Sequence, residues 1–117
     1  MSNSTLLNTL IHLDNEYGVS GDETAVAAVL RQEMDGLYDE YKADPMGNQY
    51  FIKYGKNRDK KIVFSAHMDE IGFIINYIEP NGLARFLPVG YHDDRTAVNQ
   101  DMVVSTDDGR RVYGVTG

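Results

Sequence analysis

Three polar residues directly follow a short apolar run near the middle of this 117-residue chain. The run, Ile62-Val63-Phe64-Ser65-Ala66, leads into His67-Met68-Asp69-Glu70. Its β-branched and aromatic side chains predict a buried strand over residues 61–66. Residues two positions apart in extended backbone face the same side, so the side chains of His67 and Asp69 are expected to project together. An imidazole beside a carboxylate, at the carboxyl end of a strand, indicates a candidate metal ligand.

The same three residues are also compatible with a solvated strand end that binds nothing, and the pattern alone does not decide between the two. The other histidines offer no better site. His12 falls beside the apolar stripe of a predicted helix, with nothing nearby to complete a metal site. His92 is followed by Asp93 and Asp94, and we interpret this segment as a loop that sets the entry to the next strand.

The composition excludes several classes of protein. A net charge of −7 argues against a nucleic-acid-binding surface. The absence of cysteine rules out disulfides and thiolate metal sites and is compatible with a reducing cytosol. No apolar run approaches the ~20 residues of a membrane helix, and the first residues lack a basic signal region. We therefore expect a cytoplasmic protein with neither a membrane nor a nucleic acid as partner.

The first 70 residues predict a mixture of helices and strands. Residues 4–15 carry apolar side chains at helical spacing. A second helix is expected from the capping box Ser20-Gly21-Asp22-Glu23 to about Gly36. Its predicted core positions share one face: Ala25, Val26, Val29, Leu30 and Met34. An edge strand over residues 37–42 and a strand over residues 49–54 flank the turn Asp44-Pro45-Met46-Gly47-Asn48.

The residues after Gly72 predict only strands. Residues 73–78 and 83–87 flank the turn Glu79-Pro80-Asn81-Gly82, whose Asn-Gly pair favours a hairpin. Residues 102–105 and 110–115 predict a second hairpin. We therefore predict two domains, over residues 1–70 and residues 71–117.

Several stretches, in this order and at these intervals, resemble the amino-terminal third of the tetrahedral aminopeptidases, the family of glutamyl and deblocking aminopeptidases. The resemblance covers essentially the whole chain. Its landmarks are Val19-Ser20-Gly21-Asp22-Glu23, Asp44-Pro45-Met46-Gly47-Asn48, Ala66-His67-Met68-Asp69-Glu70-Ile71-Gly72-Phe73, Arg85-Phe86-Leu87-Pro88-Val89-Gly90 and Gly114-Val115-Thr116-Gly117.

The resemblance implies an α/β fold: the start of a mixed-sheet metallopeptidase domain, followed by part of an inserted β-rich, barrel- or PDZ-like domain used in dimerisation. It implies peptide substrates, two divalent metal ions (zinc or cobalt), and homo-oligomers in which dimers assemble to a dodecamer. It also implies that His67 is a metal ligand and that Asp69 is the catalytic-site carboxylate that orients it. The remaining ligands and the general base of the family have no counterpart here, since the chain contains no Glu-Glu pair.

A catalytic zinc needs about three protein ligands, so one histidine does not make a competent site. We therefore expect an amino-terminal fragment of a metalloaminopeptidase that is inactive by itself and prone to self-association through uncovered strand edges. The alternative is a non-catalytic β-rich assembly module. A carbohydrate hydrolase is disfavoured, because glycosidases need two carboxyl groups across the bond and the adjacent Asp69 and Glu70 would face opposite sides of a strand.

Overall fold

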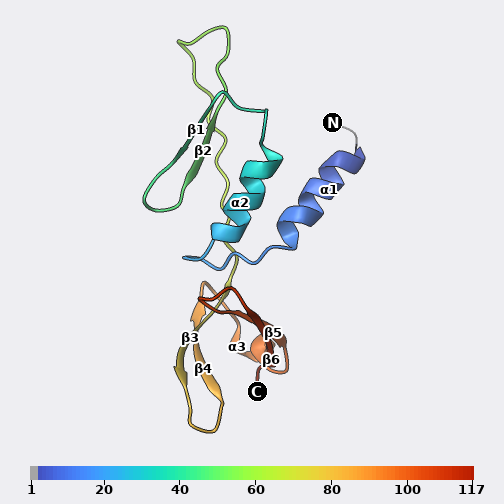
Figure 1. Ribbon diagram of the computed structural model, residues 1–117, viewed down its shortest axis with the longest axis vertical. Coiled ribbons are helices and arrows are strands. Elements are labelled where there is room, and N and C mark those ends of the chain that lie inside the picture. The colour runs from blue at the N-terminus through green and yellow to red at the C-terminus, as the bar shows by residue number, and fades with distance from the viewer. Residues whose placement is uncertain (1–2) are drawn as a thin grey trace. The chain divides into compact units, whose positions relative to one another are not determined.

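The computed structural model describes residues 3–117, which divide into two compact units, Met1–Gly72 and Phe73–Gly117. Figure 1 shows the helices and strands of the two units. The elements of the first unit are the helices α1 (Asn3–Asp14) and α2 (Thr24–Glu33) and the strands β1 (Glu40–Ala43) and β2 (Gln49–Ile52). The elements of the second, with the first residue of β3 at the boundary, are β3 (Gly72–Ile78), β4 (Ala84–Val89), α3 (Asp94–Ala97), β5 (Asp101–Ser105) and β6 (Arg111–Val115).

Both long helices are present as predicted, but the predicted capping box is wrong. Helix α2 begins at Thr24, three residues later than a Ser20 cap requires. Gly21 has a φ of +97°, which is incompatible with a first helical turn at that position. The carboxylate of Glu23 instead accepts a hydrogen bond of 2.8 Å from the Gly21 N–H, within the turn that precedes the helix.

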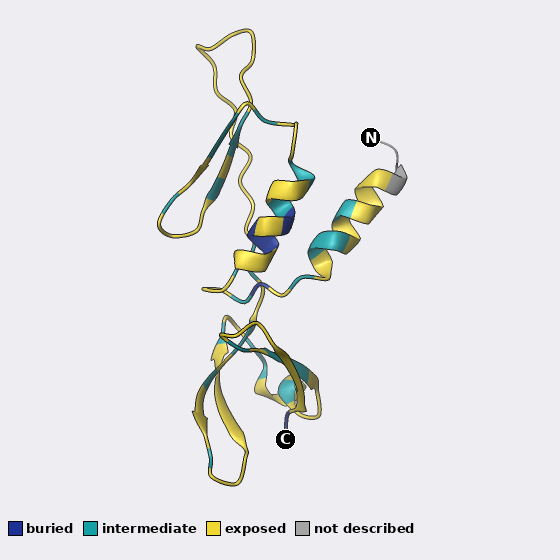
Figure 2. Ribbon diagram, in the orientation of Figure 1, coloured by how far each residue is buried: buried dark blue, intermediate teal, exposed yellow. Residues whose placement is uncertain are grey.

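The buried apolar side chains of the first unit lie on α2. Val26, Ala27 and Val29 are each 9% exposed. Figure 2 shows dark blue, buried stretches on this helix. The predicted core positions are thus confirmed at Val26 and Val29. The predicted apolar stripe of α1 remains exposed to solvent, with Leu6, Leu7, Leu10 and Ile11 between 50 and 56% exposed.

Polar contacts join α1 to α2. The Thr9 hydroxyl donates a hydrogen bond of 2.7 Å to Oε2 of Glu33, and Nδ1 of His12 lies 2.9 Å from Oε1 of the same carboxylate. These contacts lower the pKa of Glu33, chiefly through the Thr9 hydrogen bond and then through His12. His12 is therefore a partly exposed helix residue with a structural partner, as its place in the sequence indicates.

The first hairpin is confirmed, with shorter strands than predicted. Strands β1 and β2 pair antiparallel, with Tyr41 opposite Phe51. The carboxylate of Asp44 accepts hydrogen bonds from the N–H groups of Met46 and Asn48, which closes the turn between the strands. The hairpin is therefore specified locally, by the turn residues that separate its strands.

The second unit contains both predicted hairpins. Strands β3 and β4 pair across the Asn-Gly turn, and β5 pairs antiparallel with β6. The short helix α3 was not predicted, and it lies within the segment that we expected to be a loop. Thr116, 7% exposed, closes this unit by donating its N–H to the Gln100 carbonyl and accepting the Asn99 N–H on its own carbonyl.

The described residues form three separate two-stranded antiparallel sheets and no larger mixed sheet. The mixture of helices and strands is as predicted. One parallel contact is present, an isolated bridge between Val19 and Glu70. Within residues 3–117, no helix has the length and apolar character needed to cross a bilayer.

Candidate functional site

The segment that precedes the candidate site is not the buried strand that the sequence predicts. Residues 61–69 have no regular secondary structure, and Ile62, Val63 and Phe64 are 83, 84 and 94% exposed. A strand is stable when neighbours accept and donate its backbone hydrogen bonds and cover its side chains. Among residues 3–117 no strand pairs with this segment, so the apolar run stays in solvent.

His67 and Asp69 contact one another directly. Nδ1 of His67 lies 3.1 Å from Oδ1 of Asp69 and 2.9 Å from the main-chain oxygen of the same residue. The two side chains are 85 and 40% exposed. The two-residue spacing therefore brings the imidazole and the carboxylate together, although the backbone is not part of a sheet.

The two contacts determine which imidazole nitrogen is available to a ligand. A carbonyl oxygen and an ionised carboxylate can only accept hydrogen bonds, so Nδ1 of His67 must be the donor in both. In the neutral ring the lone pair then lies on Nε2, which is the form that binds a metal. No hydrogen bond to Nε2 is found in the described part of the chain.

The imidazole of His67 can fill one ligand position of a metal centre, but it cannot form the whole centre. Within residues 3–117, no group of three or more His, Cys, Asp or Glu side chains is arranged to hold a metal ion. A zinc site requires three or four protein ligands. The described residues can thus supply a share of such a site, and the other ligands would have to come from elsewhere.

The neighbouring acid, Glu70, has different partners from Asp69. Its N–H donates to the Gly18 carbonyl at 2.8 Å, and its Oε1 accepts the Gly18 N–H at 3.2 Å. The two adjacent carboxylates therefore face different groups and do not form the pair that glycoside hydrolysis requires. The sequence did not predict the contact between Glu70 and Gly18, because it joins residues 52 positions apart and no local pattern indicates it.

His67 and Glu70 both line a cleft in the first unit with a volume of ≈ 580 Å³. The cleft is bordered by the carboxyl-terminal half of α1, by α2 and by the segment around the site. Its apolar lining comes from Leu10, Ile11, Leu13, Val26, Leu30, Ala66 and Met68. The imidazole of His67 therefore borders a cleft whose lining is largely apolar.

His92, in the second polar segment of the chain, makes contacts that stabilise the fold. The ring of His92 stacks on Phe73, with centroids 4.4 Å apart and planes 25° apart, and its Nε2 lies 3.1 Å from the Val89 carbonyl oxygen. These contacts place His92 against an aromatic ring and the main chain. Within the first unit, His12 on α1 is paired with Glu33 of α2.

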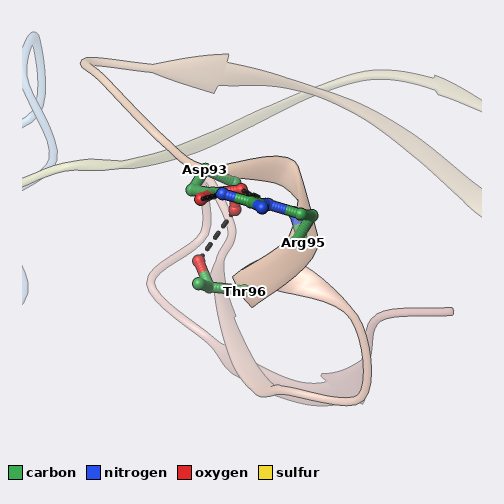
Figure 3. A network of polar contacts seen from close by, with 3 residues as sticks. All are labelled: Asp93, Arg95 and Thr96. Carbon is green, nitrogen blue, oxygen red and sulfur yellow. Dashed lines mark hydrogen bonds and ion pairs between the residues drawn. The ribbon is translucent and has the colours of Figure 1, made fainter.

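Asp93 caps the short helix α3 and binds its neighbours (Figure 3). It accepts hydrogen bonds from Nε and a terminal nitrogen of Arg95 at 2.9 and 2.6 Å, and its carbonyl accepts the Thr96 hydroxyl at 2.8 Å. The Arg95 guanidinium and N–H lower the pKa of the Asp93 carboxyl. The polar groups of this cluster bind one another and cap α3, so the segment that we interpreted as a loop is in part a short helix.

The family model for "M42 glutamyl aminopeptidase" matches residues 47–117, which include the His67–Asp69 pair and the whole second unit. The chain belongs to the M42 glutamyl aminopeptidase family. The resemblance inferred from the sequence landmarks is thereby confirmed. A lysyl aminopeptidase of Pyrococcus furiosus is 35% identical over 101 residues, which cover 86% of this chain and 28% of that protein.

Solved structures of aminopeptidases have the same fold over this length. An aminopeptidase from Desulfurococcus kamchatkensis matches with a TM-score of 0.90 at 34% identity, over 96% of this chain and 31% of that one. The TET1 peptidase of Pyrococcus horikoshii, described as able to assemble into a tetrahedron or a large octahedral shell, matches with a TM-score of 0.80 at 34% identity, over 94% and 32%. The chain spans between 27 and 31% of the length of the curated M42-family relatives that it matches.

Proposed function

We propose that this chain supplies the amino-terminal part of a metal-dependent M42 aminopeptidase, which hydrolyses amino-terminal residues from peptides. The observation that carries this proposal is the arrangement of the imidazole of His67. Its Nδ1 is held by two oxygens of Asp69, so Nε2 presents its lone pair away from them. We assign His67 as a metal ligand and Asp69 as the carboxylate that orients it.

The family membership supports two divalent metal ions, zinc or cobalt, as cofactors of the whole enzyme. Bound metals of this kind activate a water and polarise the scissile carbonyl. The chain's own contribution is narrower: Asp69 fixes the tautomer and direction of the ring, and His67 offers one nitrogen. Because the described residues contain no three-ligand group, we propose that the chain alone is inactive as a peptidase.

The two parts of the chain are proposed to have different tasks. Residues 1–70 would belong to the catalytic domain, and residues 71–117 to an inserted domain that serves dimerisation and assembly. The second unit exposes apolar side chains along its strands, which favours subunit contact. The strand residues of this kind that are more than half exposed are Ile74, Tyr77, Ile78, Leu87, Tyr113 and Val115. The TET1 peptidase of Pyrococcus horikoshii, described as a dodecamer and as able to assemble into a tetrahedron or a large octahedral shell, supports a homo-oligomer. We propose that dimers build a dodecamer and that the enzyme acts in the cytosol.

A chimera tests the assignment of the metal ligand. This chain would replace the aligned residues of the Pyrococcus furiosus lysyl aminopeptidase, to which it is 35% identical. We expect the chimera to bind Zn²⁺ or Co²⁺ and to release amino-terminal residues. His67→Ala should remove metal and activity, and Asp69→Ala should weaken metal binding about 10–100-fold. His12→Ala in the same chimera is the control and should change neither, whereas a His67→Ala chimera with full metal content would refute the assignment.

A further inference from the structure

The segment that carries His67 and Asp69 has few connections to the rest of its unit. Residues 61–69 pair with no strand in the described chain, and the hydrogen bonds found there for the imidazole of His67 both go to Asp69. A pair that is fixed only to itself can move as a whole. What holds the pair in place must therefore act on the residues next to it.

Glu70 is the residue through which this segment joins the loop between α1 and α2. Its N–H donates to the Gly18 carbonyl, its carboxylate accepts the Gly18 N–H, and it forms a parallel bridge with Val19. Gly18 is buried, so its N–H needs an acceptor inside the protein, and the Glu70 side chain provides one.

Close packing on both sides of Glu70 reinforces this connection. A Cβ on Gly18 would lie 2.6 Å from Cγ2 of Val26 and 3.4 Å from the Met68 carbonyl oxygen. A Cβ on Gly72 would lie 2.4 Å from Cγ2 of Val19. The loop and the segment therefore approach one another as closely as glycine allows, immediately beside the candidate ligand.

We propose that Glu70 is a positioning residue: by accepting the Gly18 N–H it fixes the His67–Asp69 pair relative to α2, and so fixes the direction of the metal-binding nitrogen. Glu70 touches neither the imidazole nor the Asp69 carboxylate in this arrangement, and it acts through the backbone that it shares with them. This inference rests on the proposed function, because it concerns the direction of a nitrogen assigned to a metal.

The test is the affinity of the chimera for Zn²⁺, together with the tautomer of His67 measured by ¹⁵N NMR of the imidazole. The wild type should show the Nδ1–H form. Glu70→Ala should keep that form, because the Nδ1 contacts lie within the pair, but it should weaken Zn²⁺ binding about fivefold, which corresponds to about 1 kcal/mol. Glu70→Gln should retain the wild-type affinity, because an amide oxygen can still accept the Gly18 N–H. Glu40→Ala is the matched control, because Glu40 is bound by Lys42 and Tyr54 on the first hairpin.

The outcomes separate the two proposals. A wild-type chain without the Nδ1–H form would overturn the assigned role of His67 itself. A wild-type chain with that form, together with an unchanged Zn²⁺ affinity in Glu70→Ala, would overturn only the role of Glu70.

A second measurement covers the case in which Glu70→Ala does not fold. Hydrogen exchange of the Gly18 amide, which donates to the Glu70 carboxylate, should be at least about tenfold slower in the wild-type chain than that of the exposed Lys56 amide. Equal exchange rates would show that Glu70 is not held by Gly18, which would refute its positioning role without any substitution.

Discussion

The imidazole Nδ1 of His67 lies within hydrogen-bonding distance of both the main-chain oxygen and the carboxylate of Asp69, at 2.9 and 3.1 Å. Asp69 thus accepts hydrogen bonds from the same ring nitrogen on two of its oxygens. Because both oxygens are acceptors, the proton is assigned to Nδ1 and the lone pair to Nε2. This relationship is what makes an exposed histidine suitable as a metal ligand.

Removal of the Asp69 carboxylate should loosen the ring without freeing it completely. Asp69→Ala leaves the main-chain oxygen as the only acceptor for Nδ1, so we expect a mixture of tautomers by ¹⁵N NMR. Asp69→Asn is the matched variant and should keep the wild-type tautomer, since its amide oxygen also accepts. Identical spectra for the Ala variant and the wild type would show that the carboxylate does not orient His67.

Replacement of a glycine beside the site, even by alanine, should destabilise the protein. Gly72→Ala would place a Cβ 2.4 Å from Cγ2 of Val19, and overpacking of this kind costs about 1–3 kcal/mol. Urea unfolding should report this loss. The control is Gly55→Ala in the same unit, where the nearest atom to the new Cβ is 3.8 Å away and little change is expected. Equal stabilities for the two variants would contradict the close packing.

The core of the first unit should depend on α2 and not on the apolar run at 62–64. Val29→Ala removes two methyl groups from a residue that is 9% exposed, which should cost about 1.6 kcal/mol at ~0.8 kcal/mol per group. Val63→Ala makes the same chemical change at a residue that is 84% exposed and should cost close to nothing. A loss at Val63 equal to that at Val29 would show that the run is buried in solution.

The contact between the two helices should weaken in acid. The hydrogen bonds from Thr9 and His12 lower the pKa of Glu33 below its usual value of 4.5. A carboxyl group whose pKa is lower in the folded state stabilises that state above its unfolded pKa, and the stabilisation is lost as the pH falls through the folded value. Stability should therefore decrease as the pH drops below about 4.5.

Thr9→Val tests this pH dependence, because it removes the largest cause of the shift. The variant should show a smaller decrease in stability between pH 5 and pH 3 than the wild type, when both are followed by urea unfolding (both pH values chosen to bracket the usual pKa). The same acid dependence in both chains would show that the Thr9–Glu33 hydrogen bond does not form in solution.

The sequence predicted those elements whose determinants are local. The hairpins follow from turn residues such as Asn81 and Gly82, because a turn sets the pairing of the strands next to it. The pairing of His67 with Asp69 could likewise be predicted, since it depends on a spacing of two residues. The family was also identified from local landmarks, and the M42 family model confirms it.

Elements that depend on distant partners could not be predicted. The run at 62–64 has a high propensity to form a strand. Within residues 3–117 no strand pairs with it, and without such a neighbour it does not form a strand despite this propensity. The prediction of a helix cap at Ser20 was wrong because Gly21 has a positive φ. A glycine permits this conformation, but its presence in the sequence does not require it. The contact between Gly18 and Glu70 joins residues 52 positions apart, and no local pattern indicates it.

We propose that this chain contributes one metal ligand and not a whole metal centre. The decisive measurement is the release of amino-terminal residues from a peptide by the purified 117-residue chain, with Zn²⁺ or Co²⁺ added and with His67→Ala as the control. We predict no release above the level of the control with either metal. Metal-stimulated release by the wild-type chain, absent from His67→Ala, would contradict the claim that His67 is only one part of a site completed by other residues.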